Sequence, residues 1–210
     1  MSHAQRIPYI DPSLITDPAM MAEFERAARE GAPRPESHAI RAHVPKVFWA
    51  FTNAWNDTFV EGVCDHAIKE LCRLYVSQAV NCNYCGNQRS MKAQAQGLIE
   101  DDVKELLDFD KSARFSARQK AALRLAEAIT WGLESSDELW AGLNSHFETP
   151  QIVELGFFIG LTMGQQRWNR LIGMGQSQFM AGQTGGIAPT AQASPAASAP
   201  SAAPADAAAA

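Results

Sequence analysis

Apolar residues recur every three or four positions along most of the chain, a spacing that places them on one face of an α-helix. The clearest stripe lies between about residues 65 and 80 and consists of Ile68, Leu71, Cys72, Tyr75, Val76 and Ala79. Another such set follows Pro45, and proline is favourable at the first position of a helix. No segment alternates between apolar and polar residues for long enough to indicate a strand. The pattern therefore predicts an all-α protein.

Capping residues mark where several helices begin and end. Asp17 stands before Pro18, which predicts a helix start, and Gly31 predicts the end of that helix. Ser116 and Gln119 have the spacing of a capping box, in which each side chain bonds the backbone N–H of the other residue. These signals divide the chain into helices of ordinary length.

The longest apolar stretch, Ile152 to Gly164, lies in a last long helix that opens near residue 149. It is shorter than the about 20 apolar residues that a helix needs to cross a bilayer, so we expect a buried helix and no membrane partner. Glycines repeat every fourth residue in it, at Gly156, Gly160 and Gly164. We expect another helix to pack closely against this bare side.

Composition separates a folded part from a tail. Of the 210 residues, 46% are hydrophobic, so the chain can bury one core, and we expect a single helical domain over residues 1–183. From about Thr184 the sequence is mostly Ala, Pro, Ser and Gly, which offer too little apolar area to offset the entropy lost on ordering. Residues 184–210 are therefore predicted to form a disordered tail.

The charge and the N-terminus exclude some classes of protein. The net charge is −5, and no cluster of Lys and Arg follows a predicted helix face, so a nucleic-acid partner is not expected. The first ten residues hold no apolar run of signal-peptide length, so we expect a cytoplasmic protein. In that compartment the four cysteines favour catalytic or metal-binding thiols over structural disulfides.

Cys82 and Cys85 have the spacing of a redox dithiol, which is also half of a zinc site. Zinc needs two further ligands and the sequence has no second such pair, so we expect no metal and no other cofactor. A helix from Cys82 to Gly97 would place both sulfurs and Arg89 on one face. The unpaired N–H groups at its start would lower the thiol pKa. Alternatively, both cysteines fill space in the core without reacting.

The other cysteines and histidines show no spacing that indicates ligation. We interpret Cys72 as a core residue and Cys64 as incidental. His38, His43 and His146 are isolated in the sequence, and we expect them at the surface or in helix caps.

The segment from Lys69 to Cys85 resembles the carboxymuconolactone decarboxylase and alkyl hydroperoxidase D family, in which a glutamate on a helix precedes Cys-x-x-Cys by about three turns. The similarity extends over about residues 44–180. It implies an alkyl hydroperoxidase D-like helical bundle that assembles into homotrimers or homohexamers. It also implies a peroxidase in which Cys85 attacks, Cys82 resolves the product and Glu70 joins histidines in a proton relay.

The chain departs from the family at Arg89, which stands where the family usually has a histidine. An arginine stays charged at ordinary pH and cannot shuttle a proton, but it could hold a thiolate, bind an anionic substrate group or simply face solvent. Glu70 lies opposite the apolar stripe, where we expect solvent or a subunit interface. His66, one turn earlier on the same face, could replace the missing histidine, although we expect it to be exposed.

The sequence thus favours a thiol-dependent peroxidase or dithiol oxidoreductase that reduces hydroperoxides through Cys85 and Cys82, with a protein dithiol as reductant. One alternative is a lyase or hydrolase that acts on a small organic acid, whose carboxylate Arg89 would bind. Another alternative is a non-catalytic helical oligomer that senses oxidants through the same cysteines.

Overall fold

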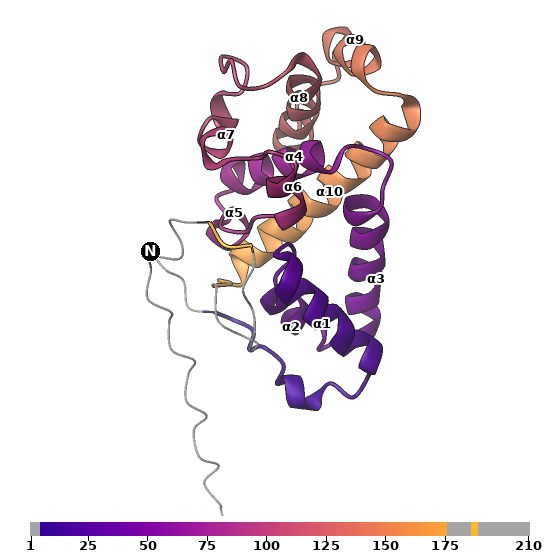
Figure 1. The fold of residues 1–210 in the computed structure, drawn as a ribbon, viewed down its shortest axis with the longest axis vertical. Helices are drawn as coiled ribbons and strands as arrows, with labels where there is room; N and C mark the ends of the chain where they lie inside the picture. The colour runs from indigo at the N-terminus through magenta and orange to yellow at the C-terminus, as the bar shows by residue number, and fades with distance from the viewer. Residues whose placement is uncertain (1–4, 176–185, 189–210) are drawn as a thin grey trace, which may run out of the picture.

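The computed structural model describes residues 5–175 and 186–188. Over these residues it has ten α-helices, short 3-10 and π-helical turns and no β-strand, which confirms the predicted all-α class (Figure 1). None of these helices is long and apolar enough to cross a membrane. The α-helices are α1 (Pro18–Glu30), α2 (Pro35–Arg41), α3 (Pro45–Trp55), α4 (His66–Ala79), α5 (Asn83–Gly86), α6 (Met91–Ala95), α7 (Glu100–Lys104), α8 (Ala117–Trp131), α9 (Asp137–His146) and α10 (Thr149–Leu171). The remaining turns are η1 (Pro12–Leu14), η2 (Asn56–Val60) and η3 (Leu106–Asp108).

Helix α4 lies at the centre of the main core and packs against α8 and α10, which also contact each other (Figure 1). The predicted apolar stripe of α4 faces this core, where Leu71, Cys72 and Val76 are buried. Each large apolar side chain buried in this way contributes about 1.5–3 kcal/mol. The core therefore anchors α4 firmly, and the Cys82–Cys85 turn follows directly at its C-terminal end.

Helices α1 to α3 add an aromatic cluster beside the main core. Phe24 of α1 stacks on Phe48 of α3 with ring centroids 5.9 Å apart. Phe59 of η2 stacks on Phe158 of α10 with centroids 5.1 Å apart, and Trp55 lies against both rings. These contacts hold the end of α3 against α10.

The predicted caps are present where the sequence places them. The Asp17 carboxylate accepts the backbone N–H of Ala19 at 2.9 Å, and Gly31 ends α1 in the left-handed conformation with φ +84°. Ser116 and Gln119 form the expected capping box at the start of α8. Local side-chain chemistry thus sets the ends of both helices.

The prediction of one helix from Cys82 to Gly97 is wrong. The segment instead forms α5 and α6, separated by a loop at 87–90. In a continuous helix the Arg89 N–H would donate to the Cys85 carbonyl. Here the Cys85 carbonyl accepts from Arg73 of α4 at 2.9 Å, and the Arg89 N–H donates to the Gly186 carbonyl at 2.8 Å. Long-range partners have thus replaced the bond between Arg89 and Cys85 that a continuous helix would contain.

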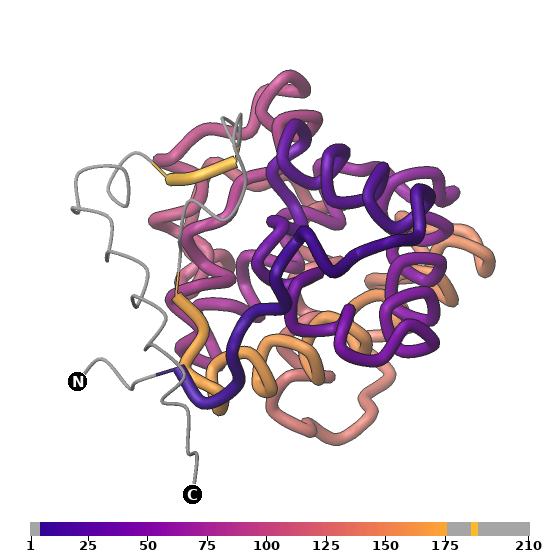
Figure 2. Tube along the Cα trace, turned by 90° about the horizontal axis from the view of Figure 1, so that it is seen from below, coloured from indigo at the N-terminus to yellow at the C-terminus, as the bar shows by residue number. Residues whose placement is uncertain are grey.

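Three residues of the predicted tail, Gly186 to Ala188, lie beside that loop (the short yellow segment in Figure 2). Gly186 crosses Gly31 so closely that a Cβ on Gly186 would stand 2.2 Å from the Gly31 Cα. Both glycines have positive φ, so this crossing requires glycine on both sides. The rest of the predicted tail lies outside the described residues.

The glycine side of α10 is not a close helix contact within the described part of the chain, contrary to our expectation. Nothing described lies within 4 Å of the place where a Cβ would stand on Gly156, Gly160 or Gly164. The helix buries its opposite side, which includes Leu155 and Ile159. The glycines therefore face outward.

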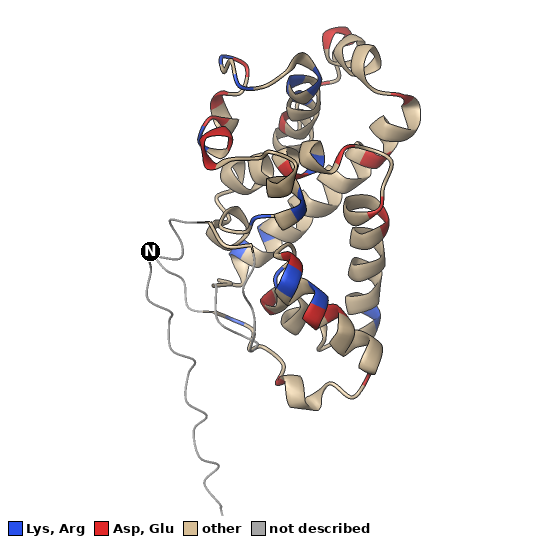
Figure 3. Cartoon of the chain, in the orientation of Figure 1, with Lys and Arg blue, Asp and Glu red and all other residues tan. Residues whose placement is uncertain are grey.

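Charged residues are mixed over the face drawn in Figure 3. Acidic and basic residues are interspersed along α1 and around α7. Arg26 pairs with Glu30 at 2.7 Å, and Lys104 pairs with Asp101 at 2.8 Å. In the part of the chain that the structure describes, no helix in this view is formed mainly of Lys and Arg.

Candidate active site

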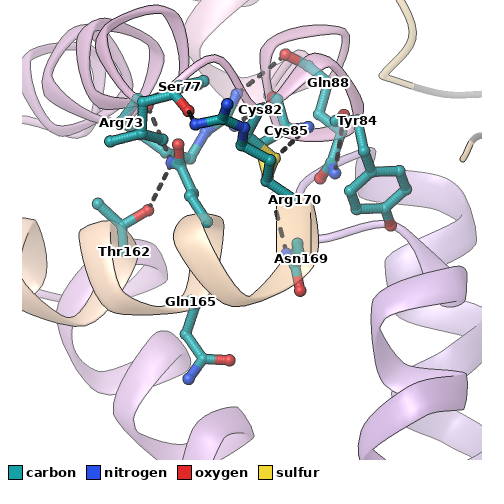
Figure 4. Close-up of a disulfide and its surroundings, with 12 residues drawn as sticks. Arg73, Ser77, Cys82, Tyr84, Cys85, Gln88, Thr162, Gln165, Asn169 and Arg170 are labelled. Atoms are coloured by element: carbon teal, nitrogen blue, oxygen red, sulfur yellow. Dashed lines mark hydrogen bonds between the residues drawn. A yellow bond between two sulfur atoms is a disulfide. The ribbon is translucent and has the colours of Figure 1, made fainter. Parts of the chain in front are cut away.

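Cys82 and Cys85 lie at the turn from α4 into α5 and are joined by a disulfide, with 5.3 Å between their Cα atoms (Figure 4). Asn81 makes the turn by adopting a left-handed conformation with φ 61°, which asparagine tolerates better than most residues. Cys82 then caps α5, and its Sγ accepts the backbone N–H of Cys85 at 3.3 Å. The structure therefore brings the two sulfurs together, as the sequence spacing predicts.

The two cysteines differ in their position relative to a cavity at this turn. Cys82 and Cys85 are just 2% and 3% exposed, so neither sulfur lies at the surface. Cys85 lines a cavity of about 30 Å³, which has room for about two water-sized groups, whereas Cys82 does not line it. The cavity lies between α2, α3, α4 and α10, and its other lining residues are Pro33, Ser37, Arg41, Phe51, Trp55, Arg73, Tyr84, Gln88, Thr162, Gln165, Gln166 and Asn169.

Helix α10 supplies one wall of this cavity. Asn169 donates from its side-chain amide to Cys85 Sγ at 3.7 Å (Figure 4). The neighbouring Arg170 donates to the Val80 carbonyl at 3.0 Å and so ties the same helix to the end of α4. A donor aimed at Cys85 Sγ would stabilise a thiolate there once the disulfide is reduced.

Glu70 is fully buried, which corrects the expectation that it faces solvent or a subunit interface. Its side chain is 0% exposed and forms two hydrogen bonds with the Arg73 guanidinium at 2.6 and 2.8 Å. It also accepts the backbone N–H of Ser90 at 2.9 Å. The loop between α5 and α6 covers this polar face of α4, and such long-range packing has no signal in the helical pattern.

Arg73 is a site residue that the sequence interpretation missed. Its guanidinium donates to the Cys85 carbonyl and to the Gln88 carbonyl, each at 2.9 Å. Arg73 therefore links the carboxylate of Glu70 to the backbone of the cysteine turn, and it also lines the cavity (Figure 4). The spacing of Glu70 and Arg73, three residues apart on one helix, was the available signal.

His66 is also buried, contrary to the expected exposed position. Its Nδ1 lies 2.8 Å from the Phe59 carbonyl, which can only accept, so Nδ1 carries a proton. In the neutral ring Nε2 then accepts from the Ser90 hydroxyl at 2.7 Å. Burial lowers the pKa of His66 below its usual value and favours this neutral form. Ser90 thus bridges His66 and Glu70.

Arg89 does not share a helix face with Cys85, so that geometric expectation is wrong. Its guanidinium makes two hydrogen bonds to the Glu100 carboxylate, at 2.7 and 2.9 Å. Arg89 is buried and does not line the cavity beside Cys85. The break after α5 turns its side chain toward α7, where Glu100 neutralises its charge.

The remaining cysteines lie in the core. Cys72 is fully buried, as predicted, and its thiol donates to the Ala122 carbonyl at 3.5 Å. Burial raises the pKa of Cys72 strongly and that of Cys64 to about 11. Neither thiol is therefore activated at neutral pH.

The isolated histidines differ in their surroundings. His43 is exposed, but His38 is completely buried against Phe24, Phe48 and Phe51, which contradicts its expected surface position. Burial lowers the pKa of His38 well below its usual range. His146 is half-buried at the end of α9. Over residues 5–175 and 186–188, no three His, Cys, Asp or Glu residues are placed to hold a metal ion.

Sequence comparisons place the chain in a family. A model of the carboxymuconolactone decarboxylase family matches residues 45–128, which include both cysteines of the turn. The uncharacterized protein YdfG of Bacillus subtilis (strain 168) is 31% identical over 110 residues, which cover 51% of this chain and 73% of YdfG. The uncharacterized protein YnjA of Escherichia coli (strain K12) is 28% identical over 106 residues, covering 50% of this chain and 58% of YnjA. The chain belongs to the carboxymuconolactone decarboxylase family.

Solved structures with the same fold include an uncharacterized peroxidase-related protein from Ralstonia eutropha JMP134, described as an alkylhydroperoxidase AhpD core. It has a TM-score of 0.68 and 18% identity, and the match covers 88% of this chain and all of the other. The debrominase Bmp8, as a cysteine-to-alanine variant in complex with 2,3,4-tribromopyrrole, has a TM-score of 0.69 and 18% identity, over 87% of this chain and 96% of the other. The fold is thus alkyl hydroperoxidase D-like.

Proposed function

We propose that this protein is a thiol-dependent oxidoreductase that reduces hydroperoxides, with Cys85 as the attacking residue and Cys82 as the resolving residue. The observation that carries the proposal is the adjacent sulfur pair, of which Cys85 and not Cys82 lines the cavity next to α10. The family membership and the peroxidase-related fold relatives support the same chemical class.

The proposed first step takes place at Cys85 Sγ. The thiolate attacks the terminal oxygen of the hydroperoxide, so that an S–O bond forms as the O–O bond breaks. The departing alkoxide takes a proton and leaves as an alcohol. Cys85 becomes a sulfenic acid, and the peroxide has accepted two electrons. Asn169 is placed to stabilise the thiolate that starts this step.

The second step forms the disulfide that the structure contains. The Cys82 thiolate attacks the Cys85 sulfur, and the hydroxide that leaves takes a proton to become water. One thiol of a protein dithiol then attacks Cys85 Sγ and releases Cys82 as a thiolate, and the second thiol attacks the resulting mixed disulfide and releases Cys85. The Cys85 N–H already donates to Cys82 Sγ, so this leaving thiolate is stabilised where it forms.

Glu70 acts differently from the proton-transfer role that the family resemblance implies. Its carboxylate hydrogen-bonds to Arg73 and to the backbone N–H of Ser90, and Arg73 reaches the backbone of Cys85 rather than its sulfur. We propose that Glu70 and Arg73 position the cysteine turn. His66 reaches this network through Ser90, and burial favours its neutral form.

We also propose that copies of the chain assemble through the outward side of α10. Large apolar side chains on this helix are exposed, namely Val153, Phe157, Trp168 and Leu171. By helical angle they share one side with Gly160 and Gly164. An exposed apolar stripe of this kind is typical of surfaces that pack against another protein chain.

Peroxide titration with peptide mapping tests the proposed chemistry. The fully reduced protein is treated with one equivalent of tert-butyl hydroperoxide, and we expect a Cys82–Cys85 disulfide to form. The Cys85→Ser variant should form no disulfide, and the control variant Cys64→Ser should form the same disulfide as the unchanged protein. Continued peroxide consumption with dithiothreitol is expected from an enzyme, whereas a sensor would oxidise once and stop. If both thiols stay reduced under excess peroxide, the proposal is wrong.

A further inference from the structure

The cavity beside Cys85 contains a positive charge that no carboxylate of the described residues neutralises. Arg41 of α2 is 7% exposed, and its guanidinium has only neutral partners, the Ser37 carbonyl at 2.8 Å and the Gln165 side-chain oxygen at 2.8 and 3.3 Å. Its Cζ also lies 3.5 Å from the centre of the Phe51 ring. Among the described residues no Asp or Glu forms an ion pair with Arg41.

The other charged residue of the cavity is already neutralised. Arg73 is paired with Glu70, and the cavity lining contains no carboxylate. His38, one turn before Arg41, is held neutral by burial. The cavity therefore has a net positive charge, and a buried cation without a counter-ion is costly. An anionic ligand would offset this cost.

Two further polar groups of the cavity lining lack partners among the described residues. They are the donor Trp55 Nε1 and the acceptor Gln166 Oε1. The orientation of the Gln166 amide is fixed, because its Nε2 donates to the Arg73 carbonyl at 3.0 Å and to the Thr162 hydroxyl at 2.9 Å. A ligand that satisfies both groups must supply one acceptor and one donor.

We propose that this cavity selects a small organic hydroperoxide that carries a carboxylate near its O–O bond. The carboxylate pairs with Arg41 and accepts from Trp55 Nε1, while the hydroperoxyl O–H donates to Gln166 Oε1 beside Cys85. The volume of about 30 Å³ has room for about two water-sized groups, so it restricts the ligand to the smallest hydroperoxides that carry a carboxylate. This inference rests on the proposed function for Cys85 as the reacting residue.

Two alkylating reagents of nearly equal size test the anion preference without a peroxide. Iodoacetate and iodoacetamide both lose iodide when a thiolate attacks, but only iodoacetate is negatively charged. The rate of each at Cys85 of the reduced protein is measured by peptide mapping and compared with N-acetylcysteinamide. We expect the iodoacetate-to-iodoacetamide ratio at Cys85 to exceed that of the free thiol by about tenfold, the effect of one charge-assisted hydrogen bond.

Variants separate charge recognition from general thiol activation. Arg41→Gln should return the ratio to that of the free thiol. Arg41→Lys should keep an intermediate ratio, because the positive charge remains but the planar guanidinium with its paired N–H donors is lost. The exposed Arg167→Gln removes the same charge from α10 and should leave the ratio unchanged. If Arg41→Gln slows both reagents equally, Arg41 acts only on the thiolate and the anion proposal is overturned.

The same preparation distinguishes this inference from the proposed function. If the protein turns over the neutral tert-butyl hydroperoxide but its iodoacetate-to-iodoacetamide ratio equals that of the free thiol, only the anion proposal is overturned. A raised ratio without peroxide turnover overturns the peroxidase function and supports the anion site. If neither reagent alkylates Cys85, both proposals fail.

Discussion

Removing the charge of Glu70 should destabilise the protein strongly, because Arg73 would then be buried without a counter-ion. Glu70→Gln conserves shape and can still accept hydrogen bonds, so the substitution isolates the charge. The two side chains are 0% and 3% exposed and make hydrogen bonds of 2.6 and 2.8 Å. Breaking a buried pair of this kind costs about 3–5 kcal/mol.

Urea unfolding measures the effect. With a slope of about 2 kcal/mol per M, the expected loss lowers the midpoint by about 2 M. The exposed pair of Lys104 and Asp101 provides the control, and Asp101→Asn should leave the midpoint unchanged within error. The double variant Glu70→Gln with Arg73→Met should lose less than the sum of the single variants, since it leaves no unpaired charge.

The reasoning about this pair has a clear point of failure. A loss below about 1 kcal/mol for Glu70→Gln would mean that Arg73 is solvated or paired elsewhere. Full additivity in the double variant would show that the two charges do not interact. In either case Arg73 would not hold the cysteine turn in the way that its bonds to the Cys85 and Gln88 carbonyls indicate.

Three further predictions concern other parts of the chain. Burial lowers the pKa of His38 below 6.5, so the unfolded state binds the proton more readily than the folded state. The free energy of unfolding, measured in urea, should therefore fall as the pH drops from 7.5 to 5.5. His38→Leu should flatten this pH dependence. Gly186→Ala should displace the segment that pairs with the Arg89 N–H and speed its hydrogen exchange, whereas Gly132→Ala, with open space around it, should not. Phe157→Glu should lower the mass of the proposed α10 assembly in analytical ultracentrifugation while the far-UV circular dichroism spectrum stays helical, and an unchanged mass would contradict the interface.

Local chemistry explains which features the sequence predicts well. The apolar stripe of α4 and the caps at Asp17 and Ser116 depend on neighbouring residues, and the structure confirms them. The adjacency of Cys82 and Cys85 follows from two intervening residues in a tight turn. These features need no knowledge of the rest of the chain.

Long-range contacts explain the failures. Glu70 and His66 were expected outside because the helical pattern cannot reveal that the α5–α6 loop folds over them. The break after α5 depends on Arg73 and Gly186, which are distant partners. Arg41 gave no signal either, since α2 precedes the family segment and meets the cavity only through its packing near α10.

The most direct test of the central claim is to trap the first oxidation product of Cys85. In Cys82→Ser no resolving thiol remains, so one equivalent of hydroperoxide in the presence of dimedone should give a single adduct, which peptide mapping places on Cys85. The matched Cys85→Ser variant should give none. A dimedone adduct on Cys82 in the Cys85→Ser variant would contradict the account. The absence of any adduct in the Cys82→Ser variant would contradict it as well.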